Sequence, residues 1–253
     1  MKSASDRIMG LLKWLLILAF VAVLLLAVVP LRWYYPYAED HFKPVVLRDV
    51  SGSLIKGSAQ QLRYDLIPLG QAEWLLYPGS LKGIGGRIRV NAEHYDLTFQ
   101  LREVNQNQAR IKNISGYLDW DSIQPYIQFS EGRFDGYWQF DIQNMVYDKQ
   151  TGIERLDGRV TLKDFTLSAP TQLPLGEVYI DLETQNESMI VGTISSRSDR
   201  LNVSGAFYIQ PNRWQLNVDL IPKAGNYQLN AALRGVGDPR PGGGRRLNRA
   251  GFY

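Results

Sequence analysis

Two pairs of aspartates are the side chains in this sequence to consider first for a catalytic role. Asp119/Asp121 and Asp135/Asp141 alternate with apolar residues in segments that have a strand-like pattern. Paired acids can hydrolyse a glycosidic bond, one as the general acid and the other as base or nucleophile. On the polar side of a strand, carboxylates usually face water and keep the surface solvated. We therefore expect surface carboxylates here and no enzyme activity.

No other set of residues has the composition of a catalytic, cofactor or metal site. The chain has no cysteine, which excludes thiol nucleophiles, iron–sulfur clusters and cysteine-ligated zinc. His41, in the segment after the apolar N-terminal run, and His94, on a predicted polar strand face, have no nearby partner set and are expected at the surface. The glycines within residues 83–86 precede no helical pattern, so they predict a hairpin turn rather than a phosphate cradle. We predict no catalytic residues, no cofactor and no metal.

The charge distribution argues against a nucleic-acid partner. The 253 residues carry a formal net charge of +3. The positive charge lies near the N-terminus and in the segment from Arg234 onward, whereas the body between them is slightly acidic. A nucleic-acid-binding domain concentrates lysine and arginine on its folded surface. We therefore expect no nucleic acid among the partners.

An uncharged apolar run, Trp14–Leu31, predicts a membrane anchor. As an α-helix, residues 11–31 would be about 31 Å long, and the hydrocarbon core of a bilayer is about 30 Å thick. The sequence Arg32-Trp33-Tyr34-Tyr35 then supplies the aromatic residues typical of a membrane interface. A cleaved signal peptide has a shorter apolar region and a small-residue cleavage site, and this run has neither. We expect an uncleaved transmembrane signal anchor.

The flanks of this run indicate its orientation. Lysine and arginine are equally frequent on both sides, and the α-amino group favours a cytoplasmic N-terminus. We therefore expect a single-pass protein of a bacterial inner membrane, with residues 1–10 in the cytoplasm and the bulk of the chain in the periplasm. Residues 32–44 contain two prolines that would break a continued helix, so they predict a linker.

From Val45 onward the sequence alternates between apolar and polar residues with the period of a strand. The pattern is clearest at 95–101, and it recurs at 134–142, 178–182, 201–209 and 214–220. Such alternation is typical of strands that are buried on one face. About a dozen such segments follow one another, and the only helical segment is a turn or two at Trp120–Tyr126. This order predicts an antiparallel meander and a mainly β fold.

The strand pattern sets the expected domain limits but leaves the packing open. We expect one β-domain over residues 45–234, as a curved sheet or as a sandwich of two sheets. Recurring glycines, such as Gly116, Gly136 and Gly158, are expected before strands, in turns or bulges. Residues 235–253 are rich in proline, glycine and arginine, which predicts a disordered tail. The apolar strand faces could form a closed core or an open trough for acyl chains, so lipid stays an alternative partner.

The start of the β-domain carries a spaced set of residues. Residues 50–62 read Val-Ser-Gly-Ser-Leu-Ile-Lys-Gly-Ser-Ala-Gln-Gln-Leu, and residues 74–83 read Trp-Leu-Leu-Tyr-Pro-Gly-Ser-Leu-Lys-Gly. This stretch resembles protein N of the type II (general) secretion pathway, which pairs V-S-G-T-L-W-x-G-x-A-x-x-L with W-x-L-x-P-x-x-L-x-G. The matching positions are Val50, Gly52, Leu54, Gly57, Ala59, Leu62, Trp74, Leu76, Pro78, Leu81 and Gly83. The chain departs from the pattern at Ile55, where the family has a large aromatic residue.

The resemblance implies a component of the type II secretion machinery. Such a protein is anchored in the inner membrane and supports export of folded proteins across the outer membrane through contacts with other inner-membrane subunits. The resemblance implies no enzyme activity, and it implies structural or interaction roles for the matching residues. A weaker likeness to AsmA-type envelope proteins rests on the alternation of glycines and strands, and it implies an apolar groove for lipid handling.

Overall fold

The structure is a computed structural model that describes residues 28–64, 67–78, 84–104, 107–123, 133–169, 172–186, 189–211, 213–223, 225 and 227–252. The predicted anchor at residues 11–31 lies outside this range except for 28–31, and the predicted cytoplasmic segment 1–10 lies wholly outside it. Among the described residues, no helix is both long enough and apolar enough to cross a membrane. The single β-domain expected over 45–234 corresponds to parts of two compact units, which divide between Tyr77 and Pro78.

The first unit is a small antiparallel sheet with a short helix. Its elements are η1 (Leu31–Trp33), α2 (Tyr35–Phe42), β1 (Val45–Gly52), β2 (Lys56–Tyr64), β3 (Ile67–Pro68) and β4 (Gln71–Pro78). β2 lies between β1 and β4, and β3 pairs with the end of β2. The segment 32–44, expected to be a linker, contains the short helix α2. Pro36 lies in the first turn of α2, where the helix needs no backbone N–H from it, so this proline favours the helix instead of breaking it.

Helix α2 begins with a side chain that caps the outer strand of this sheet. The backbone N–H of Leu47 in β1 donates a hydrogen bond of 2.8 Å to the Tyr35 hydroxyl. The outer strand of a sheet has a row of backbone groups without a strand partner, which can pair with another chain. The buried Tyr35 side chain therefore satisfies one such donor on β1.

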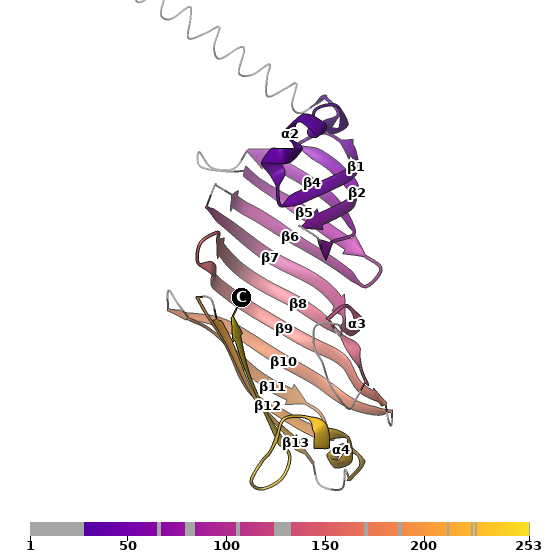
Figure 1. Cartoon of the computed structure of the whole chain (residues 1–253), viewed down its shortest axis with the longest axis vertical. Helices are drawn as coiled ribbons and strands as arrows, with labels where there is room; N and C mark the ends of the chain where they lie inside the picture. Colours follow the sequence, from indigo (N-terminus) through magenta and orange to yellow (C-terminus); the bar gives the residue numbers. More distant parts are fainter. Residues whose placement is uncertain are drawn as a thin grey trace, which may run out of the picture. The chain divides into compact units, whose positions relative to one another are not determined.

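The second unit is one antiparallel sheet with short helical segments. Its strands are β5 (Ile84–Ala92), β6 (Tyr95–Val104), β7 (Gln108–Asp119), β8 (Arg133–Asp148), β9 (Gly152–Ala169), β10 (Leu173–Asn186), β11 (Met189–Arg197), β12 (Leu201–Gln210), β13 (Arg213–Pro222), β14 (Asp238–Pro239) and β15 (Arg245–Phe252). Each strand from β5 to β13 pairs with the next, and β15 then lies between β13 and β14 (Figure 1). The described strands of this unit form no second sheet. The predicted antiparallel meander is confirmed, and the sandwich alternative is wrong.

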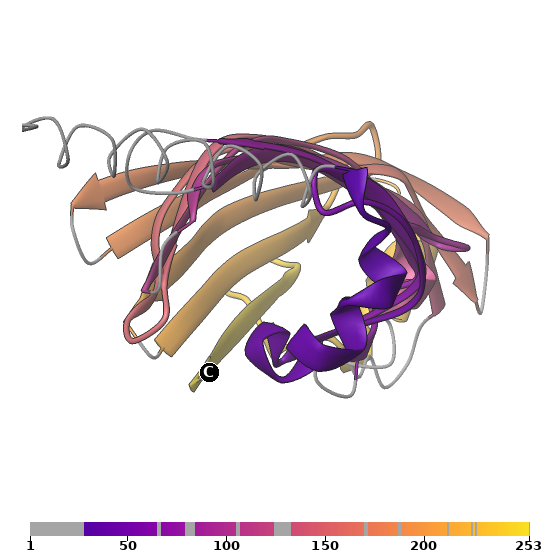
Figure 2. The same cartoon turned by 90° about the horizontal axis from the view of Figure 1, so that it is seen from above.

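The sheet of the second unit has one apolar and one polar face. Partners across neighbouring strands share a face, and one row of partners runs through Leu118, Trp138, Leu162 and Val178. On the opposite face, Asp141, Arg159 and Asp181 form a corresponding row, joined by an ion pair of 2.5 Å between Arg159 and Asp181. Figure 2 shows that these strands are twisted and curved. The predicted one-faced strands are therefore confirmed.

Short helices cover part of the apolar face. These are α3 (Trp120–Ile123), α4 (Tyr227–Ala232) and η3 (Leu233–Gly235). Leu229 and Leu233 are almost fully buried in a cluster with Leu162 and Val178 of the sheet. Trp120 joins this cluster and stacks on Trp138 with ring centroids 5.7 Å apart. The sequence predicted α3, whereas α4 is too short to show a helical period and was not expected.

Glycines lie inside the long strands. Gly116 in β7, Gly136 in β8 and Gly158 in β9 all have positive φ angles. At Gly116 (φ 142°), a Cβ atom would lie 1.9 Å from the backbone oxygen of Asp96 in β6. Any side chain there would push these two strands apart. These three glycines do not precede strands, because the strands continue through them, whereas the expected bulge is found at Gly136, where the register shifts between Asp135 and Tyr137.

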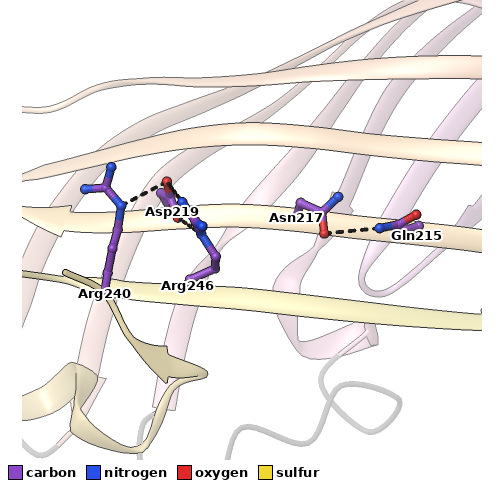
Figure 3. A network of polar contacts seen from close by, with 5 residues as sticks. All are labelled: Gln215, Asn217, Asp219, Arg240 and Arg246. Atoms are coloured by element: carbon purple, nitrogen blue, oxygen red, sulfur yellow. Dashed lines mark hydrogen bonds and ion pairs between the residues drawn. The ribbon is translucent and has the colours of Figure 1, made fainter.

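The C-terminal segment forms a strand. β15 pairs with β13 from Arg213↔Phe252 to Leu220↔Arg245, so the prediction of a disordered tail over residues 235–253 is wrong. The guanidinium of Arg246 donates to both carboxylate oxygens of Asp219, at 2.7 and 2.8 Å, and Arg240 Nε lies 3.1 Å from the same carboxylate (Figure 3). From composition alone, these arginines are expected to be solvated charges. In the fold, the Asp219 carboxylate binds Arg246 and Arg240, and Leu247 packs against the apolar cluster.

The Arg246 hydrogen bonds lower the pKa of the Asp219 carboxyl, and the charges of Arg240 and Arg246 act in the same direction, against the opposing effect of burial. A carboxyl group whose pKa is lower in the folded chain stabilises the fold at pH values above its unfolded pKa of about 3.9. That contribution is lost as the pH falls through the lowered pKa of the folded state.

We predict that Asp219→Asn lowers the free energy of unfolding by about 1–2 kcal/mol at neutral pH, because the charged hydrogen bonds to Arg246 are weakened. The difference from wild type should shrink as the pH falls below about 3.9, because the wild-type carboxylate is then protonated as well. Circular dichroism melts of the full chain in detergent, recorded over this pH range, measure both effects. Asp199→Asn is the control, since Asp199 is exposed and forms no ion pair within the described part of the chain. An equal effect of both substitutions, or one that does not depend on pH, would contradict the prediction.

Candidate functional site

The motif residues of the first unit meet around the indole of Trp74. Trp74 lies in β4, directly opposite Gly57 of β2. Its Nε1 donates to the backbone oxygens of Ser53 and Leu54 at 3.3 and 3.1 Å. These two residues form the turn between β1 and β2. The indole therefore connects β4 to the turn of the neighbouring hairpin.

Two glycines of the motif make room for this contact. A Cβ atom on Gly57 would lie 2.5 Å from Cζ2 of Trp74, so only glycine lets the indole lie across β2. Gly52 has a φ of 78°, and a Cβ atom there would lie 2.4 Å from the backbone oxygen of Lys56. Glycine adopts such a conformation without steric cost. The motif therefore builds the tight turn on which Trp74 rests.

The structure brings most of the remaining motif residues into the same three strands. Val50 pairs with Ala59, which is buried. Leu62 lies opposite Leu47, and the N–H of Leu76 donates to the backbone oxygen of Ile55 at 2.6 Å. Pro78 is the last residue of β4, while Leu81 and Gly83 lie outside the described residues. An interaction role for the motif stays a prediction, because these contacts are all within the unit.

The acidic residues considered for catalysis lie on strands and in the short helix α3. Asp141 is exposed on β8 and faces Arg159 of the neighbouring strand. Asp135 lies 3.9 Å from Arg133, and both side chains are half exposed or more. In the described part of the chain, no group of three histidine, cysteine, aspartate or glutamate residues could hold a metal ion.

The two histidines, Asp121 and the glycines of residues 83–86 also form no catalytic site within the described residues. His94 lies in the turn between β5 and β6, not on a strand face as predicted, and its Nδ1 is 3.6 Å from Oδ2 of Asp119. Asp121 is exposed in α3, and His41 lies in α2. The hairpin turn predicted at residues 83–86 is wrong for Gly85 and Gly86, which are buried in β5.

The apolar face of the second unit is the largest feature that sequence analysis left undecided. Beside the cluster under α3 and α4, this face continues over β6 to β9. Ile142 is buried there, while the other apolar side chains are half buried: Leu97, Phe99, Leu101, Ile114, Phe140 and Val160. Several of them are direct cross-strand partners, such as Phe140 and Val160. This part of the face is an apolar surface, which can bind another apolar group.

The polar face carries a shallow hollow of about 530 Å³ over β8 to β11. It is lined by charged groups that include Asp141, Arg159, Asp181 and Glu183. Arg159 Nε donates to Asp181 Oδ1, and its guanidinium lies 5.8 Å from the ring centre of Tyr179. Arg159 offsets the charge of Asp181, and the remaining carboxylates leave the hollow net negative and solvated.

Sequence reasoning found the motif and the strand faces but missed α4 and β15. A weak signal for the α4–η3 segment existed, because Leu229 and Leu233 are spaced to share one side of a helix, although a single pair makes no period. For β15, only Leu247 and Phe252 interrupt a polar stretch, and no periodic pattern results.

We predict that Trp74→Phe lowers the free energy of unfolding by about 1–2 kcal/mol, because it removes the donor shared by the Ser53 and Leu54 carbonyls and keeps an aromatic ring. The control is Tyr77→Phe in the same strand, whose side chain is exposed and should tolerate the change. Melts followed by circular dichroism compare both variants with wild type. Similar shifts for the two variants would show that the indole hydrogen bonds do not hold the turn.

Comparison with known proteins identifies the family of this chain. Residues 43–248 match the family described as type II secretion system (T2SS), protein N. Searches of curated proteins and of solved structures found no match. The match covers strands of both units and confirms the resemblance that the residues from Val50 to Gly83 indicated. The chain therefore belongs to the family of type II secretion system protein N.

Proposed function

We propose that this protein is an inner-membrane-anchored component of the type II secretion machinery whose β units lie in the periplasm. There it supports export of folded proteins across the outer membrane through contacts with other inner-membrane subunits. The family match over residues 43–248 carries the proposal, because it covers strands of both units. A role at the cell envelope also suits a chain with a long apolar run before its first strand.

The membrane anchor is proposed from the sequence at residues 11–31. The uncharged run is long enough to span a bilayer as a helix, and it is followed by interfacial aromatic residues. The net positive N-terminus would then stay in the cytoplasm. The same arrangement places both β units on the other side of the inner membrane.

A function through contacts also suits the surfaces of the described residues. Of the acidic side chains first considered for catalysis, Asp121 and Asp141 are exposed, and Asp135 and Asp141 lie beside arginines. In contrast, the second unit offers an apolar sheet face on which side chains such as Leu97, Phe140 and Val160 are half buried. We propose that the protein is not an enzyme and uses no cofactor.

Deletion of the gene should reduce export of the secreted enzymes, and wild-type protein expressed in trans should restore it. A variant in which residues 1–31 are replaced by a cleavable signal peptide tests the anchor. It should reach the periplasm but restore export poorly, because the domain is no longer concentrated at the membrane. Secreted activity in the medium and pull-down from solubilised membranes measure export and partner contact.

Two controls make this experiment decisive. The variant Tyr77→Phe, whose exposed hydroxyl is the only group removed, should restore export like wild type. Normal export in the deletion strain, with no other secretion subunit recovered by pull-down, would contradict the role in secretion. Full restoration by the protein without residues 1–31 would contradict the need for an anchor.

A second candidate function is lipid handling on the apolar face of the second unit. The observation that favours it is the single-layered sheet, which leaves Phe99 and Phe140 half buried instead of enclosed between two sheets. Acyl chains could lie along such a face, with the polar face remaining in water.

Native mass spectrometry of the detergent-purified full chain tests this alternative. Co-purifying lipid should be present in wild type and reduced by Phe99→Ser combined with Phe140→Ser. The control is Gln139→Ser, because Gln139 lies on the opposite face of β8 and is exposed. Absence of lipid from wild type, or equal retention by all variants, would rule the alternative out.

A further inference from the structure

The outer edge of β15 is largely without a strand partner. On its inner side β15 pairs with β13 over its whole length. On its outer side β14 pairs with Arg245 and Arg246. Among the described residues, no strand pairs with the outer side from Leu247 to Phe252. This edge therefore presents backbone donors and acceptors to the surroundings.

The direction of the neighbouring backbone shows which residues turn their N–H and C=O groups toward this outer side. The backbone oxygen of Asn217 in β13 points toward β12, since it lies 2.1 Å from the position that a Cβ atom on Gly205 would take. Asn248 is the partner of Asn217 across the β13–β15 pair. Because strand residues alternate in the side to which their N–H and C=O point, Asn248, Ala250 and Phe252 direct theirs outward.

The one charged side chain along this free edge, from Leu247 to Phe252, is that of Arg249, and Arg245 lies just before it in β15. Arg249 is exposed, and its guanidinium donates to the backbone oxygen of Asn248 at 3.2 Å. Arg245 and Arg249 form no ion pair with a carboxylate of the described residues, in contrast to Arg246, which is held by Asp219. A second copy of β15 at this edge would add like charges to it. A segment with carboxylates would be attracted instead.

A hollow of about 370 Å³ lies at the same end of the sheet. It is lined by residues of β12, β13 and β15, among them Tyr208, Gln215, Ala250 and Phe252. Phe252 is 86% exposed, so a large apolar ring stands free at its rim. In strand addition, main-chain hydrogen bonds supply affinity and pockets for alternate side chains supply specificity. This edge has both features.

We propose that the outer edge of β15 binds an extended acidic segment of a partner protein as an additional antiparallel strand. A carboxylate of that segment lies opposite Arg249, and an apolar side chain on its other face enters the hollow beside Ala250 and Phe252. The inference rests on the geometry and charge of this edge and does not depend on the role in secretion. Failure of the peptide to bind the purified protein would therefore not contradict the role in export, and a negative export experiment would not contradict this proposal.

Binding of a fluorescein-labelled peptide of about eight residues, alternating glutamate and valine, tests the proposal by fluorescence anisotropy. The full chain in detergent should bind this peptide and should not bind a peptide with lysine in place of glutamate. Ala250→Pro should abolish binding, because proline removes an outward N–H and leaves the hydrogen bonds to β13 in place. Ala250→Ser is the matched control, since it keeps that N–H.

A charge variant tests the same surface without altering the backbone. Arg249→Glu should weaken binding of the acidic peptide by about tenfold or more. Arg87→Glu, an exposed residue of β5 with the same change of charge, should have no effect. Amide hydrogen exchange should slow at Asn248, Ala250 and Phe252 when the peptide binds.

Several outcomes would overturn the proposal. The first is absence of binding to wild type, and the second is equal binding to Ala250→Pro in a folded protein. Protection of other strands in hydrogen exchange would place the peptide elsewhere. Sedimentation that shows a wild-type dimer, lost in Ala250→Pro, would identify a second copy of the chain as the occupant.

Discussion

The apolar face of the C-terminal sheet must be shielded from water without a second sheet, and this constraint shapes the whole second unit. Burial of apolar surface is worth about 25 cal/mol per Å². The helical segments α4 and η3 place Leu229 and Leu233 on the face, while Trp120 packs beside Trp138. Where these short helices do not reach, as at Phe99 and Phe140, the side chains stay half buried. The sheet thus has a closed core at one part and an apolar surface at another.

A single-layered sheet also has outer strands, and the outward backbone groups of β1 and β15 are covered to different extents. On β1, the Tyr35 hydroxyl accepts an outward N–H, so the start of α2 acts as a cap. On β15, β14 covers only Arg245 and Arg246, and the uncovered part carries one charged side chain, that of Arg249. Charged side chains on an edge discourage pairing between identical copies. They also select the charge of any partner, which is how an edge strand becomes a specific binding surface.

The motif turn and the surfaces of the sheets relate the family assignment to the structure. The motif around Trp74 forms a tight turn, in which Gly57 and the indole are in direct contact. The acidic residues of the described sheets face water or arginines, and this arrangement keeps a long β surface soluble. A protein with such surfaces and without an assembled reaction centre in its described part can act by holding other proteins or apolar molecules. Membership of the type II secretion protein N family agrees with that kind of action.

Features of this chain that depend on a local sequence pattern could be predicted, whereas features that depend on tertiary contacts could not. Alternation of apolar and polar residues is a local property, so the strands around Leu97, Trp138 and Val218 could be recognised, as could the motif from Val50 to Trp74. β15 could not, because its arginine-rich segment is ordered by pairing with β13 and by Asp219, which lies 27 residues from Arg246. Whether the apolar faces meet each other or stay open was decided by the tertiary structure alone. Alternation sets which side chains share a face, whereas what covers that face depends on where the chain folds back.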